Sequence, residues 1–210
     1  MLKTPVQWGL LVLGAVIAAS AFYIGNRLLA VAPVQPNVEP IPILKTSAVI
    51  EAPGGHAYQY IAAPRGTWEA ARIAAEKRVH RGRRGYLATI TSAAEYQFII
   101  DGVFPHSYSD VTYLGGRQTS PGEWRWVTGP EGKEDGGKGR LFWRGYEQGA
   151  LQGGSFANWM SSAFQHGGTW DVSNVCCVTL FSYGIPQFST SLGNGDEQEG
   201  VAGYLVEFGG

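Results

Sequence analysis

Apolar and polar residues alternate from His56 to Ile61, which is the pattern of a strand with one buried face. Thr67 then has the character of an N-cap residue, because its side chain can accept a hydrogen bond from the first helical turn. The residues that fall on one helical face after it are Trp68, Ala71, Ala75 and Val79. This period predicts a helix that begins after Thr67 and buries that face.

Ser92 and Glu95 have the spacing of a capping box, which predicts a second helix running through Phe98 and Ile99. Beyond this helix the helical period stops. The other apolar runs predict strands at Tyr86–Ala88, Val111–Leu114, Trp124–Val127, Val175–Phe181 and Gly203–Phe208, with a long glycine-rich loop over residues 128–174. A strand, two helices and then further strands around a long loop indicate an α+β domain.

Residues 1–30 have the pattern of a membrane anchor or a signal peptide. No charged residue occurs from Trp8 to Gly25. This uncharged run, residues 8–25, is about as long as the shortest transmembrane helices. Lys3 precedes the run, and positive charge on that side favours an N-terminus inside the cell. We therefore expect a single-pass inner-membrane protein whose domain lies on the periplasmic or extracellular side. The alternative is a signal peptide cut after Ala19-Ser20-Ala21, which would give a secreted protein.

Residues 31–54 are predicted to be a linker. The prolines of this segment are Pro33, Pro36, Pro40, Pro42 and Pro53. Proline disfavours helix and removes a backbone donor, so the segment should form an extended, semi-rigid spacer. A single domain over residues 55–210 is expected to follow it.

Composition narrows the functional classes. The chain has 16 Lys and Arg residues against 17 Asp and Glu residues, which argues against a nucleic-acid partner. Thirty glycines together with seven Trp, ten Tyr and nine Phe indicate a folded domain with many turns. The only cysteines, Cys176 and Cys177, are adjacent. Neighbours on a strand point to opposite faces, so two packing thiols are favoured over a vicinal disulfide or a metal site.

Several short motifs, taken in order, resemble bacterial C-type lectin domains. The first half of the domain carries Gly55-His56-x-Tyr58, Thr67-Trp68-Glu69-Ala70-Ala71, Gly85-Tyr86-Leu87-Ala88-Thr89-Ile90-Thr91-Ser92 and Glu95-x-x-Phe98. The second half carries Tyr113-Leu114-Gly115-Gly116, Trp124-x-Trp126-Val127, Phe142-Trp143, Asn158-Trp159 and Gly203-Tyr204-Leu205-Val206-Glu207-Phe208. The resemblance implies an α+β, C-type lectin-like fold with two helices, small antiparallel sheets and a long loop region.

The resemblance also implies that the first and last strands of the domain pair antiparallel. Tyr58 and Tyr60 are then expected to face Tyr204 and Phe208 across the pair. Trp68 and Phe98 are expected to pack the two helices onto this core, and Trp159 is expected to be a core residue.

Calcium ligands typical of the family are missing. Members that bind sugar through calcium carry Glu-Pro-Asn or Gln-Pro-Asp after the Asn-Trp pair, where this chain has Ala163-Phe164-Gln165. Calcium takes about six to eight oxygen ligands, so the usual site is not expected and no metal or cofactor is predicted. A rearranged site is the alternative, and its ligands would be Asp171, Asn174, Asn194 and Asp196. The family's usual disulfides are absent as well.

The long loop from Phe142 to Asn174 is the predicted recognition surface, since binding surfaces combine aromatic rings with a few polar groups. The candidate ligand-binding residues are Trp143, Gln165, His166, Trp170, Asp171, Asn194 and Asp196. Trp143 and Trp170 could serve loop packing or stack against a sugar ring. His56 is interpreted as structural, and the basic run Lys77–Arg84 as a solvated helix end.

No nucleophile–base pair, phosphate-binding loop or paired-carboxylate motif indicates an enzyme. The expected function is therefore that of an exported, membrane-tethered binding protein of the bacterial cell envelope, which binds carbohydrate without calcium. The alternative is a scaffold for protein–protein interaction in the cell envelope.

Overall fold

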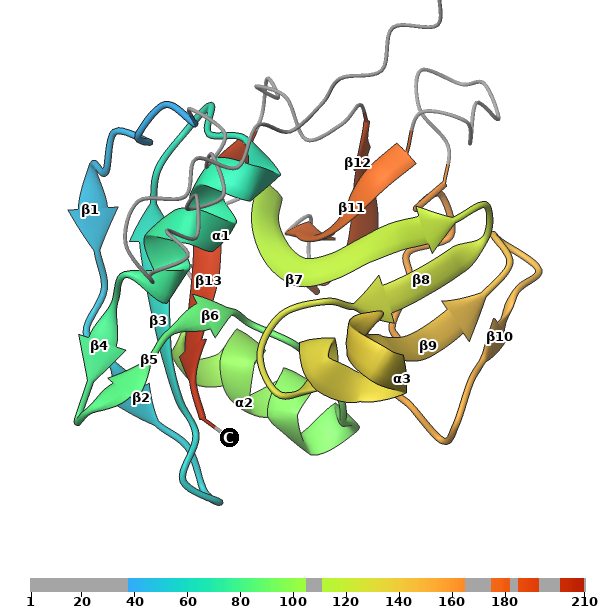
Figure 1. Ribbon diagram of the computed structural model, residues 1–210, viewed down its shortest axis with the longest axis horizontal. Coiled ribbons are helices and arrows are strands. Elements are labelled where there is room, and N and C mark those ends of the chain that lie inside the picture. Colours follow the sequence, from blue (N-terminus) through green and yellow to red (C-terminus); the bar gives the residue numbers. More distant parts are fainter. Residues whose placement is uncertain (1–37, 105–110, 165–174, 182–184, 193–200, 210) are drawn as a thin grey trace, which may run out of the picture. The chain divides into compact units, whose positions relative to one another are not determined.

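The computed structural model describes residues 38–104, 111–164, 175–181, 185–192 and 201–209, and Figure 1 shows their arrangement. The helices are α1 (Trp68–Glu76), α2 (Ala93–Gly102), the 3₁₀ helix η1 (Glu131–Lys133) and α3 (Glu134–Gly137). The strands of the first part are β1 (Lys45–Thr46), β2 (Ile50–Glu51), β3 (Ala57–Ala62), β4 (Val79–His80), β5 (Arg83–Arg84) and β6 (Tyr86–Leu87). The later strands are β7 (Val111–Ser120), β8 (Glu123–Trp126), β9 (Arg140–Arg144), β10 (Ala150–Leu151), β11 (Val175–Phe181), β12 (Gln187–Leu192) and β13 (Val201–Phe208). The predicted α+β class is confirmed.

Strand β13 lies at the centre of the sheet. It pairs antiparallel with β3, so that Phe208 lies opposite Ala57 and Gly203 opposite Ala62, and it pairs parallel with β7. The long strand β7 then leads into the antiparallel series β8, β9 and β10 and also pairs with β11 (Figure 1). The expected pairing of the first and last strands of the domain is confirmed. The small separate sheets that we expected are instead joined into one sheet, and only the hairpin of β4 and β5 stands apart among the described strands.

The predicted aromatic pairs across β3 and β13 are wrong. In the observed register Tyr58 lies opposite Glu207, and Tyr60 lies opposite Leu205. Side chains alternate between the two faces of a strand, so this register places Tyr58 and Tyr60 on one face with Leu205. The other face carries Tyr204 and Phe208.

Both predicted helix starts are confirmed. The Thr67 hydroxyl accepts from the Ala70 amide at 3.0 Å, and the Ser92 hydroxyl accepts from the Glu95 amide at 3.1 Å. Only half of the capping box forms, because the Glu95 carboxylate accepts from the Thr91 amide at 2.8 Å. Glu95 is thereby turned toward β3, where it also accepts from the Tyr58 hydroxyl at 2.7 Å.

Helix α1 ends earlier than predicted, at Glu76, so Val79 is not part of its buried face. Val79 is 63% exposed and lies in the β4–β5 hairpin, whose turn is made by Arg81 and Gly82 with positive φ. The basic run is therefore a hairpin and not a helix end. It is held by Glu51, whose carboxylate lies 2.6 Å from His80 Nε2 and 3.0 Å from an Arg81 guanidinium nitrogen.

The predicted boundary between linker and domain needs correction. Residues 45–51 form β1 and β2, which pair with β3, and the compact unit begins at Asn37. The β-branched residues of this segment, such as Thr46 and Ile50, favour pairing on the free side of β3. Residues 8–25, the predicted membrane segment, lie outside the described residues. Within the described residues, no helix is both long and apolar enough to span a bilayer.

The predicted loop over residues 128–174 also contains more regular structure than expected. Residues 131–151 form η1, α3, β9 and β10, and β9 and β10 extend the sheet beyond β8. Strand β12 was not predicted, because Gln187–Leu192 is mostly polar.

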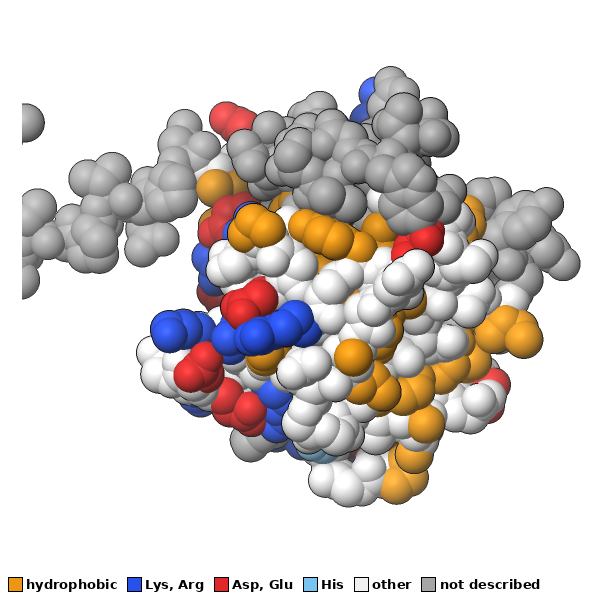
Figure 2. Space-filling model, turned by 90° about the vertical axis from the view of Figure 1, so that its right-hand side faces the viewer, with side chains coloured by type: hydrophobic (Ala, Val, Ile, Leu, Met, Phe, Trp, Pro, Cys, Tyr) orange, Lys and Arg blue, Asp and Glu red, His pale blue; other side chains and the backbone are white. Residues whose placement is uncertain are grey.

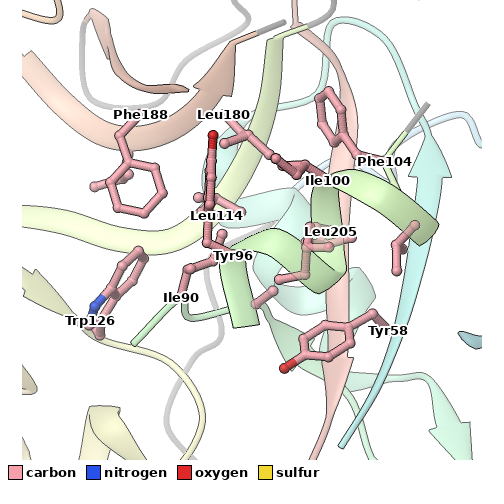
Figure 3. Packing of buried hydrophobic residues seen from close by; sticks show 14 of the residues in the cluster. Tyr58, Ile90, Tyr96, Ile100, Phe104, Leu114, Trp126, Leu180, Phe188 and Leu205 are labelled. Atoms are coloured by element: carbon pink, nitrogen blue, oxygen red, sulfur yellow. The ribbon is translucent and has the colours of Figure 1, made fainter. Parts of the chain in front are cut away.

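Two clusters of buried side chains lie on the two faces of β3 and β13. The larger cluster contains Tyr96 and Ile99 of α2, and the smaller contains Trp68 and Ala71 of α1. Figure 3 shows the larger one, where α2 side chains meet residues of β7, β11, β12 and β13. The two helices therefore cover opposite faces of the strand pair, and each is held by its own apolar stripe.

The cysteines differ from the expected pair of free thiols. Cys176 and Cys177 are joined by a disulfide, and both side chains are buried. The register of β11 shifts at Cys177 against both β12 and β7. This irregularity interrupts the alternation of faces on which the prediction of thiols depended.

Candidate functional site

The predicted recognition loop begins on the β9–β10 hairpin at the edge of the sheet. Trp143 lies on β9, opposite Trp124 of β8 and opposite Leu151 of β10. Its indole nitrogen donates to the Tyr146 carbonyl at 3.2 Å, so the hairpin's own turn fixes the ring. The ring is half-buried, which leaves part of it accessible to a ligand.

The ring of Trp159 packs against the ring of Trp143. The two rings meet edge to face, with centroids 6.3 Å apart. The rings that contact Trp159 besides Trp143 are Trp124, Phe142, Phe164 and Phe188. The backbone on either side of Trp159 pairs with Phe188, through Phe188 N to Asn158 O at 2.8 Å and Met160 N to Phe188 O at 2.9 Å. Trp159, expected to be a core residue, is half-buried and packs against the larger buried cluster.

A hollow of about 510 Å³ opens between these two tryptophans. We call it the aromatic hollow, and its lining residues are Trp143, Glu147, Gln148, Ala157, Asn158, Trp159, Met160, Ser161 and Phe164. Aromatic surface lies beside amide, carboxylate and hydroxyl groups, as in sites that bind polar ligands with apolar faces. Figure 2 shows hydrophobic side chains gathered on the face that carries β9 and β10 in Figure 1.

The position of the family's calcium tripeptide lies at the floor of this region. Ala163 and Phe164 are buried, and the Ala163 carbonyl accepts from the Thr190 hydroxyl at 2.5 Å. These two side chains therefore serve core packing and supply no oxygen ligand. In the part of the chain that the structure describes, no group of three or more His, Cys, Asp or Glu side chains is arranged to hold a metal ion.

Of the predicted ligand-binding residues, the structure describes Trp143 alone and places it in the aromatic hollow. The remaining ones, Gln165, His166, Trp170, Asp171, Asn194 and Asp196, lie outside the described residues. Their part in recognition stays a prediction, as does the rearranged calcium site.

A second hollow, of about 470 Å³, lies where α2 meets the start of β3 and the end of β13. We call it the carboxylate hollow. Its lining residues are Ala52, Pro53, Gly54, His56, Tyr58, Thr89, Thr91, Ser92, Ala94, Glu95, Phe98, Glu131 and Glu207. Three carboxyl groups and one imidazole thus share one cavity wall.

Glu207 is the most buried acid of this group, at 1% exposure. Its carboxyl group lies 2.6 Å from His56 Nδ1 and accepts from the Tyr86 hydroxyl at 2.8 Å and the Thr89 amide at 3.1 Å. Burial raises the pKa of Glu207, against the opposing effect of the His56 hydrogen bond. The hydrogen bond to Glu207 raises the pKa of His56, although partial burial opposes it.

The sequence did not predict the acids and the imidazole of the carboxylate hollow as a site. His56 was assigned a structural role, and Glu95 a capping role alone. Glu207 offered a signal, because it is the one acidic residue in the otherwise apolar strand Val201–Phe208. An acid inside a buried strand needs hydrogen-bond partners, and their existence could have been predicted although their identity could not.

Comparisons with known proteins give limited matches. No family model matches the sequence. Halomucin from Haloquadratum walsbyi is 41% identical over 97 residues, which are 46% of this chain and 1% of halomucin. The matched part is therefore a very small fraction of that protein's length.

Solved structures similar to this one include C-type lectins and a C-type lectin domain. The C-type lectin CEL-I from Cucumaria echinata has a TM-score of 0.49 at 16% identity, covering 76% of this chain and 94% of CEL-I. The carbohydrate-recognition domain of the human scavenger receptor C-type lectin has a TM-score of 0.43 at 16% identity, covering 72% of this chain and 89% of that domain.

Proposed function

We propose that this chain carries a C-type lectin-like binding domain that takes a carbohydrate ligand at the aromatic hollow, without calcium. The observation that carries this proposal is the half-buried Trp143 ring, fixed by its own hairpin and standing beside exposed polar groups. Sugars present apolar C–H faces that stack on aromatic rings, and hydroxyl groups that pair with amides and carboxylates. Asn158, Gln148 and Glu147 supply such partners around the ring.

The carboxylate hollow is a weaker candidate for this role. Its polar groups already bond one another, as in the contacts of Glu207 with His56, Tyr86 and Thr89. A ligand that binds there would have to break these hydrogen bonds before forming its own, so the net gain in binding free energy would be small. The aromatic hollow keeps the Gln148 side chain exposed at its rim.

Trp143→Ala and Gln148→Ala in the full-length chain should weaken glycan binding, by roughly three- to tenfold for the tryptophan. Loss of the stacking surface explains the first effect, and loss of a rim amide the second. Binding is measured on a glycan array and then by titration with the best sugar, with a chelator and again with added calcium. The chelator should leave the affinity unchanged, because Ala163 and Phe164 are core residues.

Gln97→Ala is the matched control, since Gln97 is an exposed glutamine on α2. It should bind as the unmodified chain does. Trp143→Phe separates stacking from folding, because it keeps an aromatic ring against Trp159. Absence of binding to any sugar in both conditions would contradict the proposal. Capture of a specific protein through the same hollow would then favour the interaction scaffold.

We further propose that the domain is exported and tethered to the membrane, in a binding rather than a catalytic role. The uncharged run Trp8–Gly25 after Lys3 supports this, together with the prolines that follow it. Protease added to spheroplasts, whose inner membrane is intact, should remove the domain, and the full-length chain should sediment with membranes. A soluble chain beginning at Phe22 would indicate signal cleavage, and protection of the domain behind the intact inner membrane of spheroplasts would contradict export.

A further inference from the structure

The first and last strands of the domain are joined at one end by His56 and Glu207. His56 immediately precedes β3, and Glu207 is the penultimate residue of β13. The His56 side chain is 40% exposed and that of Glu207 is 2% exposed, so the imidazole lies between solvent and a buried carboxyl group. A proton arriving from solvent can therefore reach this pair without unfolding of the sheet.

We propose that His56 and Glu207 form a proton-dependent clasp, which holds the end of β13 against the start of β3 and loosens as the pH rises. The proposal stands on the 2.6 Å contact between a buried acid and a partly exposed imidazole at the meeting point of the two strands. It concerns the carboxylate hollow and is independent of sugar binding at the aromatic hollow.

The surroundings of the clasp make it sensitive to charge. The titratable groups that face it are Tyr58 on β3, Tyr86 on β6, Glu95 on α2 and Glu131 on η1. Two cations lie nearby: Arg140 of β9 pairs with Glu131, and Arg83 of β5 donates a hydrogen bond to the Gly55 carbonyl. With a proton on the imidazole, one positive charge offsets this group of acids. Loss of that proton leaves Glu207 and Glu95 to repel each other across the hollow.

The direction of the pH effect follows from both partners. The pKa of His56 is raised above its ordinary value of 6.5, so its contribution to stability is complete below that value and is lost as the pH rises through the folded-state pKa. The pKa of Glu207 is also raised, above its ordinary value of 4.5. Its contribution to stability is therefore also lost as the pH rises, beginning at a lower pH than for His56. The carboxylates with lowered pKa are Glu51, Glu69 and Glu134, and their contribution to stability is lost in acid, below the pH window of the clasp. The tyrosines with raised pKa that line the same region, Tyr58 and Tyr86, lose their contribution only above their ordinary pKa of 10.

The test uses a second pair as its matched control. His80 Nε2 lies 2.6 Å from a Glu51 oxygen, the same distance as in the clasp, but the Glu51 side chain is 37% exposed. Urea unfolding of the full-length chain in a neutral detergent is measured at about pH 6 and about pH 9 for the unmodified chain, His56→Gln and His80→Gln. For the unmodified chain, the unfolding equilibrium constant should be roughly threefold or more larger at about pH 9 than at about pH 6. His80→Gln should show the same increase.

His56→Gln should abolish the rise. A merely structural role would lower stability equally at both pH values and leave the rise intact, which would overturn the proposal. The NMR titration of the His56 ring, assigned by its absence in His56→Gln, gives an independent measurement. It should titrate above the ordinary histidine value of 6.5. Titration at or below that value in the unmodified chain overturns the proposal even if the variants fold poorly.

Discussion

Phe188→Ala is expected to destabilise the domain by about 3–5 kcal/mol, because it removes a fully buried ring that four other rings surround. Those rings are Tyr96, Trp126, Phe156 and Trp159, with centroids 5.7–6.5 Å from that of Phe188. Figure 3 shows the ring directed toward Trp126 in the core. The free energy of unfolding, measured by urea denaturation, is the test.

Ile185→Ala is the control for this substitution. Ile185 lies three residues earlier and is 72% exposed, so its truncation should change the free energy of unfolding by no more than about 0.5 kcal/mol. Because Phe188 also pairs through its backbone with Asn158 and Met160, Phe188→Ala should loosen the floor of the aromatic hollow. Equal stability of the two variants would show that β12 is not part of the core.

Gly203→Ala is expected to cost about 3 kcal/mol or more, because β13 runs too close to β3 at this position for any side chain. A Cβ on Gly203 would overlap the Ile61 carbonyl oxygen and carbon. These are backbone atoms of β3, which pairs here with β13 on one side and β1 on the other, so they cannot move aside as a flexible side chain could. Thermal unfolding of the variant against the unmodified chain measures the effect.

Gly102→Ala provides the same substitution in open space. A Cβ at Gly102, the last residue of α2, would meet nothing within 4 Å. Alanine is a better helix former than glycine, so stability should stay unchanged or rise by up to about 1 kcal/mol. A comparable loss of stability in both variants would contradict the close approach of β13 to β3.

The parts of the fold that sequence predicts are those encoded within a few residues. Thr67 and Ser92 cap their helices through bonds spanning three residues, so both helix starts could be predicted from local pattern. The register of β3 against β13 joins segments far apart in sequence, and its prediction failed. Strand β12 was missed because only Phe188 and its tertiary contacts, and not its polar neighbours, place it in the core.

The candidate site likewise has one part that local sequence pattern predicts and another that depends on tertiary contacts. Trp143 could be selected because an aromatic residue beside a glycine-rich loop suggests a binding surface. Its support by Trp159, and the burial of Ala163 and Phe164, depend on packing that no local pattern encodes. The contact of His56 with Glu207 spans 151 residues and follows only from the observed register of β13.

The order of β2, β3 and β13 also determines how the domain bears a pulling force. The described chain enters beside Ala62, where Lys45 pairs, and leaves beside Ala57, where Phe208 pairs. Entry and exit therefore lie at opposite ends of β3, with β1 and β2 along one side and β13 along the other. Tension between residues 45 and 208 slides these flanking strands lengthwise past β3. Hydrogen bonds between antiparallel strands lie across the strand direction, so such tension loads them together in shear instead of opening them one after another.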